Sequence, residues 1–226
     1  MPIQRGTDAV MLLIALPLLL RFLFQAKDGS RRAGVLLTGM LAVFLYNAAS
    51  TVFGVAFNPL FPLYVIYFSV SLYAFALALS SQGRSTPLPD PLRKTVTVFL
   101  FLSGLSTAVW LVEIVPALLE NRAPDTLAHY TTEVTAILDW GIVAPACFIA
   151  GLSVLRRRPL GAMLAPVLLV LMTMVGIIVS GQRIMQALVN ASVSSTETAV
   201  YVLPFLILSA AAAWLLRRSL AAIPSS

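Results

Sequence analysis

Seven long apolar runs divide the chain, and they restrict what it can fold into more than any other feature. Each run has at least the length of about 20 residues that an α-helix needs to cross a hydrocarbon layer about 30 Å thick. A helix also satisfies its own backbone hydrogen bonds in lipid. The runs cover residues 7–24, 33–55, 60–80, 95–118, 133–154, 160–188 and 198–216. We therefore expect an all-α, seven-transmembrane helix bundle, with residues 1–226 forming a single transmembrane domain.

The composition agrees with a chain whose solvent is lipid. Hydrophobic residues make up 59% of the sequence and charged residues 11%, whereas soluble domains hold roughly 25% charged residues. The net charge of +6 would suit nucleic acid only if basic residues gathered on a water-facing surface. They lie instead in short connections between apolar runs. We therefore expect the lipid bilayer as a partner and no nucleic acid.

The basic residues alternate along the chain in a way that predicts the orientation of the helices. They follow the first, third, fifth and seventh runs: Lys27, Arg31, Arg32, Arg84, Arg93, Lys94, Arg156, Arg157, Arg158, Arg217 and Arg218. The intervening connections hold Arg122 as their one clear base. Cytoplasmic loops are enriched in lysine and arginine, so we expect the N-terminus outside and the C-terminus in the cytoplasm. No small-residue cleavage site follows the first run, which predicts a retained helix in a multi-pass protein of the cell membrane.

A weak internal similarity relates the two halves of the chain. Arg31 to Gly34 leads into the second run much as Arg157 to Gly161 leads into the sixth, and prolines at 17 and 145 interrupt the first and fifth. Some small transporters contain parallel repeats, and a three-plus-one-plus-three arrangement would relate runs one to three with runs five to seven. Chance similarity between apolar helices is the simpler explanation of the same features.

Three ionisable side chains lie more than one turn from the ends of the predicted helices, at a similar depth. They are Glu113, Asp139 and Arg183, all in the half of the bilayer that the predicted topology places outside. A charge at a helix centre costs about 2.5–3.5 kcal/mol on insertion scales, so these groups need partners or a hydrated cavity. We expect Arg183 to lie within roughly 3–4 Å of Asp139 or Glu113, in a charge-assisted contact.

Polar residues on the same helices are spaced by three and four, which places them on one helix face. These faces carry Thr173, Gly176, Ser180, Arg183, Gln186 and Asn190 on the sixth helix, Ser103, Ser106, Trp110 and Glu113 on the fourth, and Asn47, Thr51, Gly54 and Asn58 on the second. With Asp139 on the fifth helix they predict a polar pocket for a small polar or cationic ligand. The candidate ligand-binding residues are Asn47, Trp110, Glu113, Asp139, Ser180 and Arg183. The alternative is a structural ion pair among small residues that let membrane helices pack closely.

The other reactive residues are too few for several familiar chemistries. Cys147 is the one cysteine and lies in an apolar run, where we expect it to be a packing residue, and His129 is the one histidine and lies in a loop. They cannot form a zinc site of histidine and cysteine ligands, and no intramembrane Ser–His pair is available. Lys27 and Lys94 lie outside the apolar runs, which excludes a retinal Schiff base. We therefore assign no catalytic residue, no metal site and no cofactor.

Two stretches of the chain carry a resemblance to other proteins. They are Tyr46 to Tyr64, YNAASTVFGVAFNPLFPLY, and Thr135 to Pro145, TAILDWGIVAP, which is followed by LRRRPLGAMLA. Over most of helices two to six, the chain resembles a family of uncharacterised bacterial multi-pass membrane proteins with seven helices. The resemblance centres on Asn58, Pro59, Asp139, Pro145 and the arginine run before Gly161. It implies a bacterial cytoplasmic membrane, brings no activity with it, and marks Asp139 as the first residue to mutate.

Three functions stay open on the sequence alone. The first is a small-molecule transporter or ligand-binding protein whose site lies between helices two, four, five and six. The second is a structural or accessory subunit that packs against a membrane partner or another copy of itself and has no substrate. The third and least favoured is an intramembrane enzyme that acts on lipid, which would need Glu113 or Asp139 as general base. A hydrated cavity that reaches Asp139 would favour the first, and a dry core the second.

Overall fold

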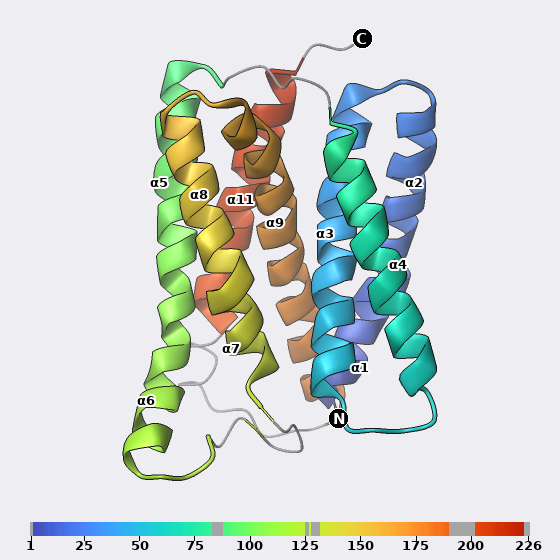
Figure 1. Ribbon diagram of the computed structural model, residues 1–226, viewed down its shortest axis with the longest axis vertical. Coiled ribbons are helices and arrows are strands. Elements are labelled where there is room, and N and C mark those ends of the chain that lie inside the picture. Colours follow the sequence, from blue (N-terminus) through green and yellow to red (C-terminus); the bar gives the residue numbers. More distant parts are fainter. Residues whose placement is uncertain (1, 83–87, 125–126, 128–131, 190–201, 224–226) are drawn as a thin grey trace.

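The computed structural model describes residues 2–82, 88–124, 127, 132–189 and 202–223, and the regular elements in this part of the chain are all helices (Figure 1). Seven helices are long and apolar enough to cross a membrane. We refer to them as spans one to seven: Ile3–Lys27, Arg31–Gly54, Phe61–Ser80, Asp90–Leu119, Val134–Leu155, Pro159–Leu188 and Leu203–Ala221. The prediction of an all-α bundle with seven apolar helices is confirmed for the described residues.

Three of the spans contain a turn that is not α-helical. Span one consists of α1 (Pro2–Val10), a π turn (Met11–Ala15) and α2 (Leu16–Lys27). Span four consists of α5 (Asp90–Ser106), a 3-10 turn (Thr107–Trp110) and α6 (Leu111–Leu119). Span five consists of α7 (Val134–Leu138), a π turn (Asp139–Val143) and α8 (Ala144–Leu155). The continuous spans are α3 (Arg31–Gly54), α4 (Phe61–Ser80), α9 (Pro159–Leu188) and α11 (Leu203–Ala221).

The observed helix boundaries differ from the predicted ones by a few residues, and the start of span four is the informative case. It begins at Asp90 rather than at residue 95. The predicted run leaves this stretch out because proline usually ends or interrupts a helix. Pro91 occupies the first turn of α5, where the missing N–H of a proline costs no hydrogen bond. Arg93 and Lys94 therefore lie on the helix. The predicted start of the seventh helix, residue 198, is outside the described residues.

The core of the bundle lies between α3 and α9, which run side by side through its centre (Figure 1). Met40 on α3 and Leu169 on α9 are completely enclosed, and the buried hydrophobic cluster continues into α5, α8 and α11. Cys147 on α8 is a fully buried member of this cluster, which agrees with its expected role as a packing residue. Large apolar side chains such as Leu12 and Leu77 point outward instead, as helices in lipid require.

Spans one and five share an unusual backbone, because each holds a π turn with a proline two residues beyond it. The π turns begin at Met11 and Asp139, and the prolines are Pro17 and Pro145. Both pairs are related by the same shift of 128 residues (139 − 11 and 145 − 17). Well under 1% of residues in proteins are π-helical. Two such turns at matched distances from a proline therefore indicate that the two spans are related.

The connections that follow these spans match at the same shift. Gly29 and Arg157 both have positive φ angles, 89° and 54°. The amides of residues 28, 29 and 30 donate to the carbonyls of residues 24, 26 and 25, and those of residues 156, 157 and 158 donate to the carbonyls of residues 152, 154 and 153. Span four ends in the same pattern at Asn121, which has a φ angle of 51°, so the turn alone does not relate the two hairpins. The equal length of the connections does, since the helices that follow begin at Arg31 and Pro159, again 128 residues apart without insertion or deletion. This corrects the predicted register, because Arg31 corresponds to Pro159 and not to Arg157.

The packing of the helices follows the same relation. Helix α1 packs against α9 and α7 against α3, α2 packs against α3 and α8 against α9, and α3 packs against α4 as α9 does against α11. The described parts of residues 2–80 and 134–221 therefore form two repeats with the same order of packing, which we call the first and second repeat. The shift of 128 residues relates their first two helices but not the third, because α4 would fall on residues 189–208 whereas α11 begins at Leu203. Span four lies between them in the sequence and packs against α8 and α11. The structure favours a three-plus-one-plus-three arrangement over chance similarity.

The two ends of the bundle differ in charge. At the end that holds the turns after spans one and five, Arg32 donates to the Ile223 carbonyl at 2.8 Å and Arg93 to the Leu155 carbonyl at 2.6 Å. These arginines satisfy carbonyl groups at or just past the ends of α11 and α8, where a helix lacks internal donors. We call this the basic end, and the opposite end, which holds α6, the α6 end (Figure 1).

Cysteine labelling is expected to place the α6 end outside the cell and the basic end in the cytoplasm, because basic loops stay cytoplasmic. In a Cys147→Ala background, Glu120→Cys should react with a membrane-impermeant maleimide on intact cells, and Ser81→Cys only after permeabilisation. Both side chains are exposed, at opposite ends of the bundle. The reverse pattern would overturn the predicted orientation, and labelling of both cysteines on intact cells would contradict an odd number of membrane crossings between them.

Candidate functional site

Asp139 is the centre of a hydrogen-bonded cluster that joins three spans. Tyr46 Oη on α3 donates to Asp139 Oδ1 at 2.8 Å, and Trp110 Nε1 on span four donates to Asp139 Oδ2 at 2.8 Å. Each carboxylate oxygen therefore accepts a hydrogen bond from a neutral donor. All three side chains are partly buried. We call Asp139, Tyr46 and Trp110 the carboxylate cluster.

Two interrupted helices bring the carboxylate cluster together. Asp139 is the first residue of the π turn in span five, and Trp110 is the last residue of the 3-10 turn in span four. A second hydrogen bond crosses between the same two turns, from Trp140 Nε1 to the Thr107 carbonyl at 3.0 Å. Irregular turns depart from the regular ladder of helical hydrogen bonds, and they are frequent at functional sites. Trp110 and Trp140 thus each donate a hydrogen bond that connects the two irregular turns.

Asn47, a predicted site residue, makes its contact with a different helix. Tyr67 Oη on α4 donates to Asn47 Oδ1 at 3.2 Å, and the ring of Tyr67 packs edge-on against Phe44 with centroids 6.4 Å apart. Consecutive residues on a helix point about 100° apart, so Tyr46 faces span five while Asn47 faces span three. Among the described residues, Asn47 has no hydrogen bond to the carboxylate cluster.

Glu113 lies one turn beyond Trp110, toward the α6 end. It lines a hollow of about 170 Å³ together with Val112, Pro116 and Arg122. Residues three apart lie on the same face of a helix, so Glu113 and Trp110 face the same side of span four. The hollow is therefore on the side of span four that Trp110 also faces, one turn nearer to the α6 end, and no residue of the carboxylate cluster lines it.

The predicted contribution of span six differs from the observed one. Arg183 Nη1 donates to Gln186 Oε1 at 3.2 Å on its own helix, and no ion pair with Asp139 or Glu113 is seen among the described residues. Ser180 Oγ donates to the Gly176 carbonyl at 2.7 Å, also within α9. Among the described residues, the hydrogen bonds of the carboxylate cluster join spans two, four and five, and Ser180 and Arg183 contribute none of them.

Span six departs from the prediction because its polar end packs against span one. Gln182 Nε2 on α9 donates to Thr7 Oγ1 on α1 at 2.8 Å. A Cβ atom at Gly6 would lie 2.5 Å from the Gln182 Cα, so the two backbones approach as closely as a glycine allows. A periodic pattern shows that a helix has a polar face, but it does not show which neighbouring helix covers that face.

Tyr46 and Trp140 are the side chains of this region that sequence reasoning missed. A signal existed for both, because Tyr46 begins the stretch YNAAST and Trp140 directly follows Asp139. Tyr46 precedes the polar face of Asn47 and Thr51 by one residue and therefore points away from it. A search for aromatic donors at the depth of each buried acid would have included them.

The two repeats allow the carboxylate cluster to be compared with the equivalent place elsewhere in the fold. At the shift of 128 residues, Asp139 aligns with Met11 and Tyr46 aligns with Met174. Met11 is 8% exposed and Met174 is 2% exposed, and both belong to the buried hydrophobic cluster. The contact of span one with span six thus contains methionines where the contact of span five with span two contains an aspartate and a tyrosine. The fold can be built at this place without a polar pair.

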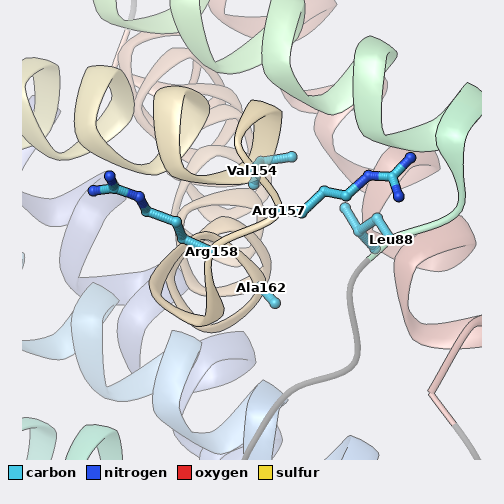
Figure 2. Close-up of a pocket in the computed structure, with 5 residues that line it drawn as sticks. All are labelled: Leu88, Val154, Arg157, Arg158 and Ala162. Atoms are coloured by element: carbon cyan, nitrogen blue, oxygen red, sulfur yellow. The ribbon is translucent and has the colours of Figure 1, made fainter.

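A smaller hollow lies at the basic end, where Arg157 and Arg158 point to opposite sides of the turn between α8 and α9 (Figure 2). Leu88, Val154 and Ala162 complete its lining, and its volume is about 10 Å³. A hollow of this size holds about one water molecule. Arg157 is engaged with Asp90 at 2.7 Å, in an exposed ion pair. This hollow is too small for an organic ligand.

No family model, no curated protein and no solved structure matches the chain. The resemblance to a family of bacterial membrane proteins has no support from these comparisons, and a bacterial origin stays a prediction. The helices themselves support a coarser description. Over the described residues the regular structure is entirely helical, and it includes seven helices long and apolar enough to cross a bilayer, as in a multi-pass membrane protein.

Proposed function

We propose that this protein is a membrane carrier or ligand-binding protein for a small polar or cationic molecule, with the carboxylate cluster as its binding site. The observation that carries the proposal is the difference between the two repeats. Asp139 and Tyr46 occupy places where the other repeat uses Met11 and Met174. An ionisable group within a membrane helix is costly and marks a functional site by default. Since methionines fill the same place in the fold, helix packing does not account for the polar pair.

The origin of the cluster residues agrees with a transport function. Tyr46 belongs to the first repeat, Asp139 to the second, and Trp110 to the span that connects them. In transporters built from repeats, substrate sites lie at the interface between the repeats, and the repeats move relative to one another. A relative movement of these two repeats would separate Tyr46 from Asp139. The cluster is therefore placed where binding and movement can be coupled.

Access to the cluster is proposed from the α6 end. The hollow beside Glu113 lies one turn from Trp110, and the distribution of basic residues predicts that this end faces the outside. A ligand that enters the hollow would meet Glu113 first and Trp110 next. The Trp110 indole covers Asp139 Oδ2 from that side.

The test replaces the carboxylate cluster by the side chains of the other repeat. The variant Tyr46→Met/Asp139→Met, with Trp110→Phe so that no donor is left without an acceptor, is expected to fold, because methionines occupy the two equivalent positions of the other repeat. Removing the donors and the acceptor together avoids the cost of an unsatisfied buried polar group. The wild-type protein should be stabilised against thermal unfolding by at least one probe among methylammonium, glucose, glycine and acetate, and the triple variant by none.

A structural or accessory subunit predicts another result. Its melting temperature would respond to none of the four probes, and wild type and triple variant would behave alike in every assay. This outcome would overturn the proposal. The variant Asp8→Asn serves as a control, because it removes an exposed carboxylate near the start of span one that accepts a hydrogen bond from Gln4 at 3.3 Å and lies outside the cluster. It should keep the wild-type response.

A further inference from the structure

We propose that the ligand of the carboxylate cluster is a small protonated amine, bound through its N–H groups to Asp139. This inference rests on the proposed function and adds the chemical class of the ligand. It follows from three features of the described contacts: the hydrogen-bond donors of the cluster, its free acceptor positions and its charge.

The hydrogen-bond donors of the cluster are already engaged within it. The Tyr46 hydroxyl and the Trp110 indole N–H both donate to Asp139. An indole has this one N–H and no acceptor, and a phenol has a single O–H. A carbonyl, carboxylate or phosphate group of a ligand would therefore have to break one of these hydrogen bonds in order to bind. The cluster is poorly suited to a ligand that mainly accepts hydrogen bonds.

The second point is the acceptors, which still have capacity. A carboxylate offers about four lone-pair positions, and Asp139 uses one on each oxygen. The Tyr46 oxygen can also accept while its hydrogen donates to Asp139. The free capacity therefore consists of acceptor positions on two adjacent side chains. An ammonium group carries several N–H donors and no acceptor, and it matches this arrangement.

The third point is charge. Among the described residues no basic side chain forms an ion pair with Asp139, and its hydrogen-bond partners are neutral. Arg183, which was expected to supply the positive charge, donates to Gln186. A carboxylate in a partly buried site attracts a counter-charge strongly because water screens it poorly. A protonated amine supplies this charge together with the donors.

The aromatic side chains favour the same ligand. Both donors to Asp139 are carried by aromatic rings, and Trp140 follows Asp139 in the chain. Tryptophan and tyrosine faces attract cations, most strongly when the cation is removed from water. An amine held at Asp139 would lie beside the rings of Tyr46 and Trp110.

The experiment measures binding of methylammonium and cyclohexylammonium to the purified full-length protein, by thermal shift and by tryptophan fluorescence in a Trp214→Phe background. Tetramethylammonium has the charge without N–H groups, and glucose and acetate represent neutral and anionic ligands. The amines are expected to bind saturably. Asp139→Asn should weaken amine binding about tenfold or more, which corresponds to about one charge-assisted hydrogen bond. Asp8→Asn, with the same change of net charge, should leave the dissociation constant unchanged.

A second variant keeps the test decisive if Asp139→Asn does not fold. The variant Tyr46→Met/Asp139→Met with Trp110→Phe lacks the carboxylate together with both of its donors, so amine binding should be lost in it. Amine binding that is unaffected by Asp139→Asn, or that is retained in this triple variant, overturns the inference. Binding of glucose or acetate alone, when it depends on Asp139, overturns the amine and leaves the proposed function standing. Absence of binding by every probe overturns both the amine inference and the proposed function.

Discussion

Replacing Gly161 by alanine is expected to cause a large loss of stability. Gly161 lies in the first turn of α9, where a Cβ atom would lie 2.3 Å from the Val154 amide nitrogen and 2.5 Å from the Ser153 carbonyl carbon. These are backbone atoms of α8 that cannot rotate away, so α8 and α9 would have to separate, as far as the first repeat does to accommodate Ala33 at the matching position. Overpacking of this kind costs about 3 kcal/mol at the upper end of the usual range. We expect the melting temperature in detergent to fall by roughly 5–10 °C.

The chain offers a matched control for this substitution. Gly34 lies in the first turn of α3, and a Cβ atom there would meet nothing within 4 Å. Gly34→Ala should therefore raise stability slightly, since alanine is better than glycine in a helix by about 0.5–1 kcal/mol. The two variants are measured by the same thermal unfolding assay. Equal melting temperatures for Gly161→Ala and the wild type would show that α8 and α9 lie further apart than described.

Replacing Asp139 by alanine should also destabilise the protein, for a different reason. The substitution leaves Tyr46 Oη and Trp110 Nε1 without their acceptor inside the bundle. Interhelical hydrogen bonds in membrane proteins contribute about 0.6 kcal/mol on average and up to about 1.7 kcal/mol, so the loss of two should cost roughly 1–3 kcal/mol. Asp139→Asn should cost less, because its amide oxygen still accepts one of the two hydrogen bonds. Unfolding with increasing sodium dodecyl sulfate measures both effects.

The stability of Asp139→Ala is read against a variant that lacks the orphaned donors. Adding Tyr46→Phe and Trp110→Phe to Asp139→Ala removes both groups that lost their acceptor. The triple variant should therefore recover part of the stability, since an unmade buried hydrogen bond costs more than an absent one. If the triple variant is less stable than Asp139→Ala alone, packing of the two rings and not hydrogen bonding governs this region.

The positions of the helices along the chain could be predicted because they depend on a property of single segments. An apolar run of sufficient length forms a membrane helix whatever its neighbours are, and each predicted run overlaps one of the seven spans in the described part of the chain. The start of α5 at Asp90 was missed because proline was read as a helix breaker in a place where it begins a helix. Which residues contact one another depends instead on how the helices are rotated and paired, and no single segment contains this information.

Asp139 illustrates the limit of such predictions. Its depth followed from its position in the apolar run, and its need for polar partners followed from the cost of a buried charge. Its partners did not follow, because the π turn that begins at Asp139 changes which residues of span five share a face. One extra residue in a turn rotates the following helix by about 100° relative to a regular one. Arg183 was the natural partner by charge, but α9 turns Gln182, its neighbour in the sequence, toward α1.

The number of helices in each repeat has a consequence for how the chain is threaded through a bilayer. A unit of three crossings starts on one side and finishes on the other, so a second unit joined directly to the first would be inserted upside down. Span four adds the crossing that restores the starting side, and it lets the turns at Gly29 and Arg157 emerge on the same side with their basic neighbours. It has no counterpart in either repeat. Its sequence is therefore free of the constraint that a matched helix carries, and the tryptophan that reaches Asp139 lies on this helix.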